Sequence, residues 1–549
     1  MIVPVLRFEG DDWARMMNAV FAENLHDMVS KVDDGKGEYE AGYFHTSTIP
    51  HEGTCYYHST WTRDAGCGLI ELCRLGFAEQ AQAAAEYLLR HINHGDHWGR
   101  TADRADPCEY ETNGNALILL GVYNAWKITG KQQETGRRYL ETVRPVIDWA
   151  QRLMEQNPHG YLMPCQSEMA GNPNTPYTVS AIYPNYAMKL ALHGLAGMAR
   201  FCSEQDWACR LSQMENQLTG AISGYLVSGV SNKGHTNTPA GCWINGLDNR
   251  DGRPYDFAEW DDTMWPAYHW TRQLPFILQS DLGMLQLPED GQRQVHLNSY
   301  DYIHSYMRKG EYFRRYGFVS GSGWTGMGER HDDTMCGYSQ GFMTQAAMVS
   351  DDVNTYSKLL EGVARLAYDG SVVEPLAYEM NPWVMHECFS YDNYAKAMDH
   401  TFGTYHMGRP GVANNPGDEG NLVQEAEIVK ALALCAGVDD STPGVLRLLP
   451  RIPWNWSGIT AENLPYVKEN GELVRISFSM QHDRATRRCR FHFESSQPVE
   501  RLEVRLGPFP RELHTLRKTD YECQQGTDSS WVWLRNLSGS QIDEEIDLW

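Results

Sequence analysis

Six segments of this 549-residue chain combine carboxylates, amides and aromatic rings, and each runs directly into an apolar helical pattern. Aromatic rings stack on the apolar faces of sugars, whereas carboxylates and amides bind their hydroxyl groups. A concave site that holds all three kinds of side chain suits a carbohydrate. The six segments are residues 55–64, 106–113, 165–185, 241–262, 320–333 and 412–421.

The carboxylates of these segments suggest a particular reaction. Hydrolysis of a glycosidic bond needs two carboxyl groups on opposite sides of the anomeric carbon. One protonates the leaving oxygen, and the other activates water or attacks directly. Each of the six segments contains at least one carboxylate, so the residue types alone leave the choice of the pair open.

The other polar and aromatic residues of the segments are candidates for substrate binding. Tryptophan rings would stack on sugar rings, and charged or amide groups would hold hydroxyls through charge-assisted or bidentate hydrogen bonds. Asp64 equally suits the N-cap position of the helix that follows it. The candidates are Trp61, Arg63, Asp64, Glu111, Asn113, Trp243, Glu259, Trp260, Asp261, Trp324, Glu329 and Arg330.

Helical periodicity indicates which elements position these residues. Apolar residues recur at helical spacing in about twelve segments. The patterns at 113–129, 185–202 and 420–437 are apolar on all sides and predict buried helices, whereas 132–156 and 352–368 have one polar face. The twelve segments are 11–30, 64–75, 77–93, 113–129, 132–156, 185–202, 205–224, 264–282, 289–309, 336–350, 352–368 and 420–437.

This alternation predicts a mainly α-helical fold. Twelve helices that alternate between inner and outer positions make six hairpins, which close into an (α/α)6 barrel over residues 1–440. Each of the six polar segments then precedes an inner helix, and all of them open at the same end of the barrel. The barrel end is therefore the expected site.

The pattern changes after Val438, where short strand-like runs alternate with turn residues. We expect residues 441–549 to form a small C-terminal antiparallel β-domain of sandwich-like type. Its expected role is to pack against the barrel, with carbohydrate binding as the alternative.

Two motifs give the chain a resemblance to a known superfamily. Residues 57–64 (YHSTWTRD) look like an aromatic–Arg–Asp sugar clamp, and residues 448–459 (LLPRIPWNWSGI) look like the start of a β-domain cap. Together with the helix order, they resemble the six-hairpin glycosidases, which include glucoamylases, barrel glucosidases and mannosidases, α-L-rhamnosidases and inverting disaccharide phosphorylases. The resemblance spans the chain at the level of architecture. The rhamnosidase RDE-Gly-Trp signature and a large N-terminal β-sandwich are absent from this sequence.

The resemblance implies positions for the two catalytic groups. In such barrels the proton donor commonly precedes the third inner helix, and the base commonly precedes the sixth. Transferred by position, the donor is Glu168 and the base is Glu419. The rival donors are Glu259 and Asp261, and the rival base is Asp418.

General physical arguments support the same two residues. Glu168 is the only carboxylate between Glu155 and Asn185, and its apolar neighbours favour a pKa raised by desolvation, as a general acid requires. Glu419 precedes the last inner helix, whose dipole favours the ionised form that a base requires. Each residue also has a non-catalytic interpretation. Glu168 would then be an ordinary surface residue of a loop, and Glu419 would be a charge that stabilises the start of its helix.

Three functions compete at this stage. The favoured one is an exo-acting, inverting glycoside hydrolase that cleaves a small oligosaccharide or glycoside. An inverting disaccharide phosphorylase would need basic and hydroxyl groups around phosphate, and the acidic segments supply few. A non-hydrolytic sugar epimerase, a lyase or a carbohydrate-binding protein is the third reading. Sugar epimerases of this fold use histidine pairs, for which His331 and His386 are available.

The composition limits partners and location. A net charge of −24 argues against nucleic acid and anionic membranes, because both require basic patches. No apolar run approaches the ~20 residues of a membrane span, and the first residues show no signal-peptide pattern. The 13 cysteines are scattered without a CxxC pair, which is typical of reduced thiols in a cytoplasmic protein.

Neither a metal nor a cofactor is expected. His91, His94 and His97 are spaced by three residues, but Gly95 interrupts the helical pattern there, so they indicate a solvated helix end. The expected partner is an oligosaccharide or glycoside substrate. The sequence does not define the oligomeric state.

Overall fold

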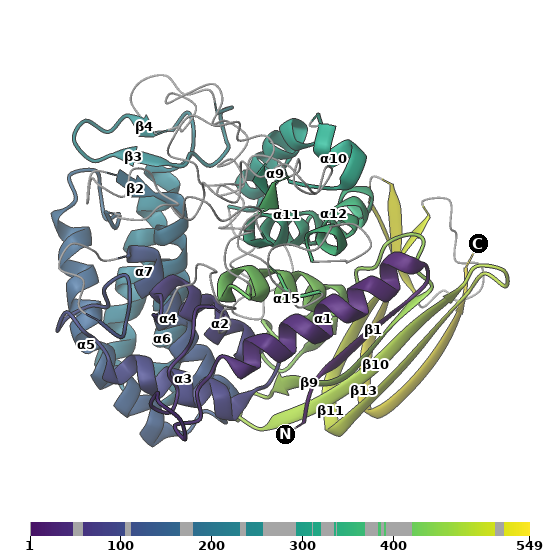
Figure 1. Ribbon diagram of the computed structural model, residues 1–549, viewed down its shortest axis with the longest axis horizontal. Coiled ribbons are helices and arrows are strands. Elements are labelled where there is room, and N and C mark those ends of the chain that lie inside the picture. The colour runs from purple at the N-terminus through teal and green to yellow at the C-terminus, as the bar shows by residue number, and fades with distance from the viewer. Residues whose placement is uncertain are drawn as a thin grey trace.

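The computed structural model combines a large helical part with a curved C-terminal sheet (Figure 1). In the part of the chain that it describes, no helix combines the length and apolarity that crossing a membrane requires. The structure describes residues 2–47, 59–104, 111–164, 179–230, 238–255, 292–309, 311–319, 334–335, 337–367, 383–385, 389–390, 420–510, 521–526 and 528–548.

Eleven of the twelve helices among the described residues follow predicted periodic segments, whereas α10 (Glu311–Tyr316) falls between two of them and was not predicted. The segment 113–129 forms Thr112–Ile128, and the segment 352–368 forms Val353–Leu366. The predicted helix 264–282 lies outside the described residues. The helices are α1 (Asp12–Ser30), α2 (Thr62–Arg74), α3 (Ala78–Arg90), α4 (Thr112–Ile128), α5 (Gln133–Gln156), α6 (Ile182–Phe201), α7 (Gln205–Tyr225), α9 (Arg293–Met307), α10 (Glu311–Tyr316), α11 (Gly337–Val349), α12 (Val353–Leu366) and α15 (Leu422–Ala436).

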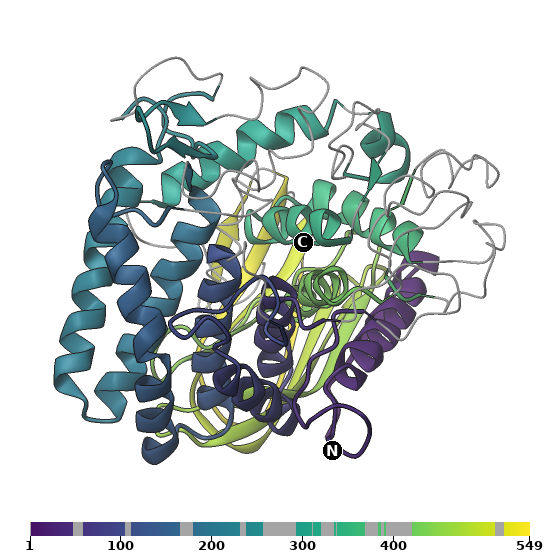
Figure 2. The ribbon, with the colours of Figure 1, turned by 60° about the vertical axis from the view of Figure 1, so that its left-hand side comes forward.

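Five helices form an inner row. Helices α6, α4, α2, α15 and α11 contact one another in that order, and α4, α6 and α15 are buried on nearly every side. The amphipathic helices α3, α5, α7, α12 and α1 pack against this row from outside (Figures 1 and 2). The inner row contains five of the six helices that the sequence places inside. Closure into a six-hairpin barrel stays a prediction.

Glycines let two inner helices approach closely where the polar segments enter them. A Cβ atom on Gly114 would lie 2.4 Å from Thr62 Oγ1, and one on Gly66 would lie 2.5 Å from Leu117 Cβ. Both distances are shorter than real carbon contacts allow. The N-terminal halves of α2 and α4 therefore pack backbone to backbone.

Buried amide side chains hold the connections that lead to the inner helices. Asn115 accepts a hydrogen bond from Trp98 N at 3.0 Å and donates one to Trp98 O at 2.8 Å. Asn185 makes the same pair of bonds with Met163, at 2.7 and 3.0 Å. Gln340 in α11 bonds the backbone before that helix in a similar way. Backbone groups that lack a regular partner are satisfied by these side chains.

We predict that Asn115→Leu lowers the free energy of unfolding by about 3 kcal/mol, because it leaves two buried backbone groups of Trp98 unsatisfied. Asn124→Leu is the matched control, since Asn124 lies on the same helix and bonds only Leu120 O among the described residues. Its expected loss is under about 1 kcal/mol. Chemical denaturation of both variants measures the difference, and equal losses would contradict the role of Asn115.

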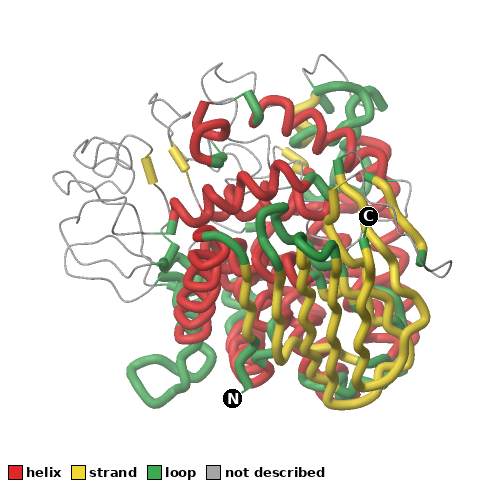
Figure 3. Tube along the Cα trace, turned by 90° about the vertical axis from the view of Figure 1, so that its right-hand side faces the viewer, coloured by secondary structure: helices red, strands yellow, loops and turns green. Residues whose placement is uncertain are grey.

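The curved sheet joins both ends of the chain (Figures 1 and 3). The strand order is β1–β9–β10–β11–β13–β12, with antiparallel neighbours, while β8 pairs parallel to β11 and antiparallel to β7. The strands are β1 (Val5–Glu9), β7 (Val438–Asp439), β8 (Leu446–Leu448), β9 (Gly458–Val467), β10 (Leu473–Asp483), β11 (Arg488–Pro510), β12 (Glu522–Gln525) and β13 (Ser529–Asp547).

Strand β1 was not foreseen as part of this sheet. Residues Val5–Glu9 fall within the segment 1–440 that the sequence assigns to the helical domain, yet Val5 pairs with Glu462 and Glu9 with Gly458. The pairing covers the edge of β9. The N-terminal residues therefore tie the helical part to the sheet.

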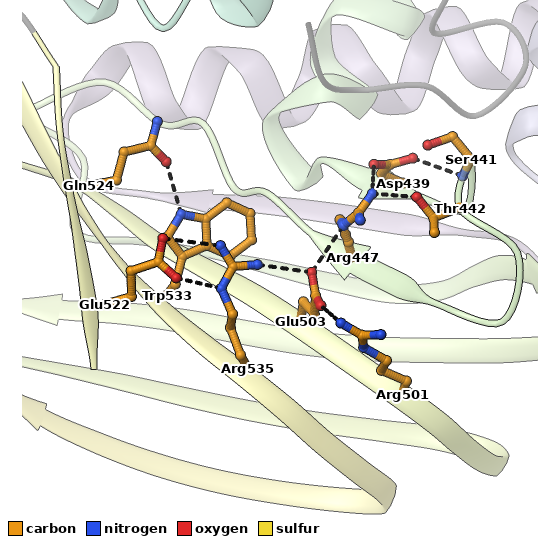
Figure 4. A network of polar contacts seen from close by, with 10 residues as sticks. All are labelled: Asp439, Ser441, Thr442, Arg447, Arg501, Glu503, Glu522, Gln524, Trp533 and Arg535. Atoms are coloured by element: carbon orange, nitrogen blue, oxygen red, sulfur yellow. Dashed lines mark hydrogen bonds and ion pairs between the residues drawn. The ribbon is translucent and has the colours of Figure 1, made fainter. Parts of the chain in front are cut away.

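A network of charges crosses the sheet and reaches Asp439 on β7 (Figure 4). Glu503 on β11 is buried and accepts hydrogen bonds from Arg447 at 3.1 Å, Arg501 at 2.6 Å and Arg535 at 3.2 Å. Desolvation alone would raise the pKa of Glu503, but the bonds from Arg447 and Arg501 outweigh it and the pKa is lowered. The ionised carboxylate thus stabilises this part of the sheet.

Candidate functional site

The N-terminal ends of α2, α4 and α15 meet at one place. Thr46 links two of them, because its Oγ1 accepts a hydrogen bond from Trp61 N at 3.0 Å and its carbonyl accepts one from Leu422 N at 2.7 Å. The close contact at Gly114 brings in the start of α4. We call this region the polar end and define it by Trp61, Arg63, Asp64, Arg100, Glu111, Asn113 and Asn421.

Two short extended segments pair at the polar end. Thr62 N donates to Arg100 O at 2.9 Å, and Thr62 Oγ1 donates to the same carbonyl at 3.0 Å. The Arg100 guanidinium lies over the ring of Trp61, 5.5 Å from its centre. Trp61 remains partly exposed. The pairing therefore places a cation and an aromatic ring side by side.

Glu111 and Asn113 place buried polar atoms at the same end. Glu111 is 6% exposed and Asn113 is fully buried. Neither amide atom of Asn113, nor Glu111 Oε2, has a hydrogen-bond partner among the described residues. A buried polar group without a partner costs about 1–3 kcal/mol, so native structures contain few of them.

Charge surrounds the Glu111 carboxylate. Desolvation by burial raises its pKa, and the positive charges of Arg63 and Arg100 oppose the rise without cancelling it. Arg63 Nε also lies 3.6 Å from Asp64 Oδ2. The polar end thus holds two acidic and two basic groups in close electrostatic contact.

The described structure brings five of the predicted binding residues together at the polar end. They are Trp61, Arg63, Asp64, Glu111 and Asn113. The candidate catalytic residues Glu168 and Glu419 lie outside the described residues. Also outside are Glu259, Trp260, Asp261, Trp324, Glu329, Arg330, His331, His386 and Asp418.

The chain on either side of the two catalytic candidates is described. Before Glu168, Met163 is bonded to Asn185 in the first turns of α6, and after it Ala181 is the N-cap of α6. After Glu419, Asn421 is the N-cap of α15. Along the chain, the segment that contains Glu168 thus precedes α6 and Glu419 precedes α15.

Trp243 has a different environment. It is fully buried, and its Nε1 donates to His296 Nδ1 at 3.1 Å while its ring meets the edge of Tyr186. Its backbone N–H donates to Ser299 Oγ at 2.8 Å. In this structure Trp243 packs between α6 and α9, and it has no exposed ring face on which a sugar could stack.

We predict that His296 makes the protein less stable in acid. Burial, with the nearby charge of Lys189, lowers the pKa of His296 to about 3, and its Nδ1 must stay unprotonated to accept from Trp243. The unfolded chain binds a proton near pH 6.5, so this histidine's stabilising contribution is complete above pH 6.5 and is lost as the pH falls towards 3. The loss is about 1.4 kcal/mol per pH unit.

Urea denaturation at pH 7, 6 and 5 tests this prediction. His296→Gln keeps an acceptor for Trp243 but cannot titrate. Its free energy of unfolding should therefore change less with pH, by the slope that corresponds to about one proton. Whether the variant is less stable at pH 7 does not matter for this comparison. An unchanged slope would show that His296 is not the titrating group.

Two buried acidic residues on α15 have structural partners. Glu425 accepts a hydrogen bond at 2.7 Å from Lys31, the C-cap residue of α1, and Glu427 accepts one from Gln345 of α11 at 2.8 Å. Desolvation, and then the charge of Asp27, raise the pKa of Glu425. These contacts hold α15 against its neighbours and support its N-terminal end.

Sequence reasoning missed two members of this region. Arg100 lies in the connection 91–104, outside the six polar segments, and reaches Trp61 only through the pairing with Thr62. Thr46 lies far along the chain from both helices that it joins. No local pattern marks either residue, because each position depends on tertiary pairing.

Comparison with known protein families and with curated proteins finds no match to this sequence. Solved structures do match. The GH78 family rhamnosidase of Bacillus sp. GL1 has a TM-score of 0.55 and 12% identity, covering 91% of this chain and 42% of that chain. The α-L-rhamnosidase from Dictyoglumus thermophilum has a TM-score of 0.55 and 8% identity, covering 100% and 51%.

The α-L-rhamnosidase from Aspergillus terreus has a TM-score of 0.52 and 10% identity, covering all of this chain and 50% of that one. This chain therefore spans about half the length of these proteins or less. The likeness shows that the fold is one found in glycosidases.

Proposed function

We propose that this protein is a glycoside hydrolase with its active site at the polar end. One observation carries the proposal: the unsatisfied buried atoms of Glu111 and Asn113 lie beside Arg63, Arg100 and the partly exposed ring of Trp61. Hydrogen bonds from sugar hydroxyls would satisfy these atoms, and the ring would cover an apolar sugar face. The fold shared with rhamnosidases agrees with this assignment.

In the proposed mechanism Glu168 protonates the leaving oxygen and Glu419 activates water. The substrate is a small oligosaccharide or glycoside cleaved from one end. Glu419 stands two residues before the N-cap of α15, where the helix dipole favours an ionised base. The proposed architecture is the (α/α)6 barrel, in which both carboxyl groups would open at the polar end.

A panel of nitrophenyl glycosides, including α-L-rhamnosides, and of disaccharides tests the function. Each is incubated with and without phosphate. Hydrolysis that is independent of phosphate supports the proposal, whereas formation of a sugar phosphate would identify a phosphorylase. The contact of Arg63 with Asp64, and the nearness of Glu111, favour hydrolysis because they neutralise the charge that phosphate would need.

We predict that the reaction inverts the anomeric configuration. An inverting enzyme leaves room for water between its two carboxyl groups, which then lie ~6.5–9.5 Å apart. Proton NMR in the first minutes of hydrolysis identifies the anomer formed before mutarotation. Retention would contradict the direct attack of water and would imply a carboxyl separation of about 5 Å.

A further inference from the structure

A cavity of about 620 Å³ lies where the connection after β8 meets the curved sheet. Its lining comes from α12, from the connection that contains Trp454, from β10, β11 and the turn between them, and from the residues on either side of β13. Pockets of ~300–1,000 Å³ are typical of small-molecule sites. None of the residues that line it belongs to the polar end.

The wall of this cavity offers a fixed aromatic platform. Trp454 is partly exposed, and its Nε1 donates to Asn354 Oδ1 at 3.2 Å. Asn354 in turn donates through Nδ2 to Asp528 Oδ2. These two hydrogen bonds favour one orientation of the indole ring. Phe509, which is buried, completes the apolar floor.

Polar groups gather beside this platform. Arg484 lines the cavity and makes no hydrogen bond or ion pair with any residue that the structure describes. His482 packs edge-on against Phe509, with ring centres 5.2 Å apart. Burial, with the charge of Arg484, lowers the pKa of His482, so its ring is neutral at pH 7. The cavity thus combines two guanidinium groups, since Arg487 also lines it, with a neutral imidazole and the Asp528 carboxylate.

We propose that this cavity binds a saccharide ring that carries a carboxylate, a uronic acid. The apolar face of the ring stacks on Trp454, and the carboxylate accepts a bidentate bond from Arg484. The hydroxyls bond to His482 and Asp528. A neutral sugar would leave Arg484 unused, and a bare anion would leave Trp454 uncovered. In a protein of net charge −24, an anion binds only where a local cation such as Arg484 attracts it.

Isothermal titration of the full-length protein tests this proposal. The ligands are D-glucuronate and D-galacturonate, which contain no bond for a glycosidase to cleave, with D-glucose and D-galactose as neutral counterparts. Sodium benzoate carries a flat ring with a carboxylate but no hydroxyls, and sulfate carries charge alone. The two ligands therefore separate the contribution of stacking from that of the charge. We expect measurable binding of at least one uronate, at least about tenfold tighter than the neutral sugars and both simpler anions.

Matched variants locate the binding. Arg484→Gln and Trp454→Ala should each weaken uronate binding by about tenfold, since one removes the charge-assisted bonds and the other the stacking face. Arg490→Gln, an exposed arginine paired with Glu545 on the same sheet, should have no effect. Trp454→Phe keeps a ring and should recover part of the affinity, which separates stacking from a fold defect.

Three outcomes would overturn the proposal. They are equal affinity for uronates and neutral sugars, equal affinity for benzoate or sulfate, and a loss of binding in Trp61→Ala but not in Trp454→Ala. The last would place the uronate at the polar end. Hydrolysis of the glycoside panel by Arg484→Gln should match the wild type, so this proposal and the proposed function can fail separately.

Discussion

Glu168→Gln and Glu419→Gln should each lower kcat on an unactivated disaccharide by about 10²–10⁴-fold, the usual contribution of a general acid or base. The two variants should then differ on a nitrophenyl glycoside. Nitrophenolate leaves with little protonation, so Glu168→Gln should recover much of its rate. Glu419→Gln should not recover, because water still needs its base.

Added azide provides an internal check on this assignment. As a nucleophile that needs no deprotonation, it should restore turnover of the nitrophenyl glycoside in Glu419→Gln and should leave Glu168→Gln unchanged. Near-normal activity of Glu168→Gln on the disaccharide would move the donor to Glu259 or Asp261. Near-normal activity of Glu419→Gln would move the base to Asp418. Circular dichroism and thermal unfolding of each variant show whether the fold is intact.

The helices were predictable because their cause is local. Burial on all sides of α4, α6 and α15 follows from sequences that are apolar around the whole helix, and α5 and α12 show the single polar face that an outer helix needs. Strand β1 was not predictable in the same way. Its five residues carry little periodicity, and their partner β9 lies about 450 residues further along the chain.

The sequence predicted which residue types the candidate site contains better than it predicted how they are arranged. Trp61, Arg63 and Glu111 lie together because helix order brings the starts of α2 and α4 to one end. Trp243 carries the same aromatic signal in its sequence but is buried beside His296. Arg100 reaches the site only through a backbone pairing. Composition identifies which residues suit a sugar, whereas tertiary contacts decide which of them remain accessible.

Glu111→Gln should separate function from stability. Its carboxylate would accept hydrogen bonds from substrate between Arg63 and Arg100, so replacing it should lower kcat/KM by about 10–100-fold, the value of one or two charge-assisted bonds. The pKa of Glu111 is raised by burial, so the folded state binds this proton more tightly than the unfolded chain does. Ionisation of Glu111 therefore opposes folding as the pH rises above about 4.5. Removing the charge should leave the free energy of unfolding at pH 7 unchanged or increase it.

Glu503→Gln is the matched control, because Glu503 is also buried among arginines but has a lowered pKa. Its ionised form stabilises the folded state at pH above about 4.5, so the variant should lose about 3 kcal/mol of stability, as expected for breaking a buried ion pair. Its kcat/KM should stay at the wild-type value. The two variants should thus have opposite effects. Glu111→Gln should lose catalysis and keep its stability, whereas Glu503→Gln should lose stability and keep its catalysis. If Glu111→Gln instead loses stability with unchanged kcat/KM, its carboxylate is structural and the active site does not lie at the polar end.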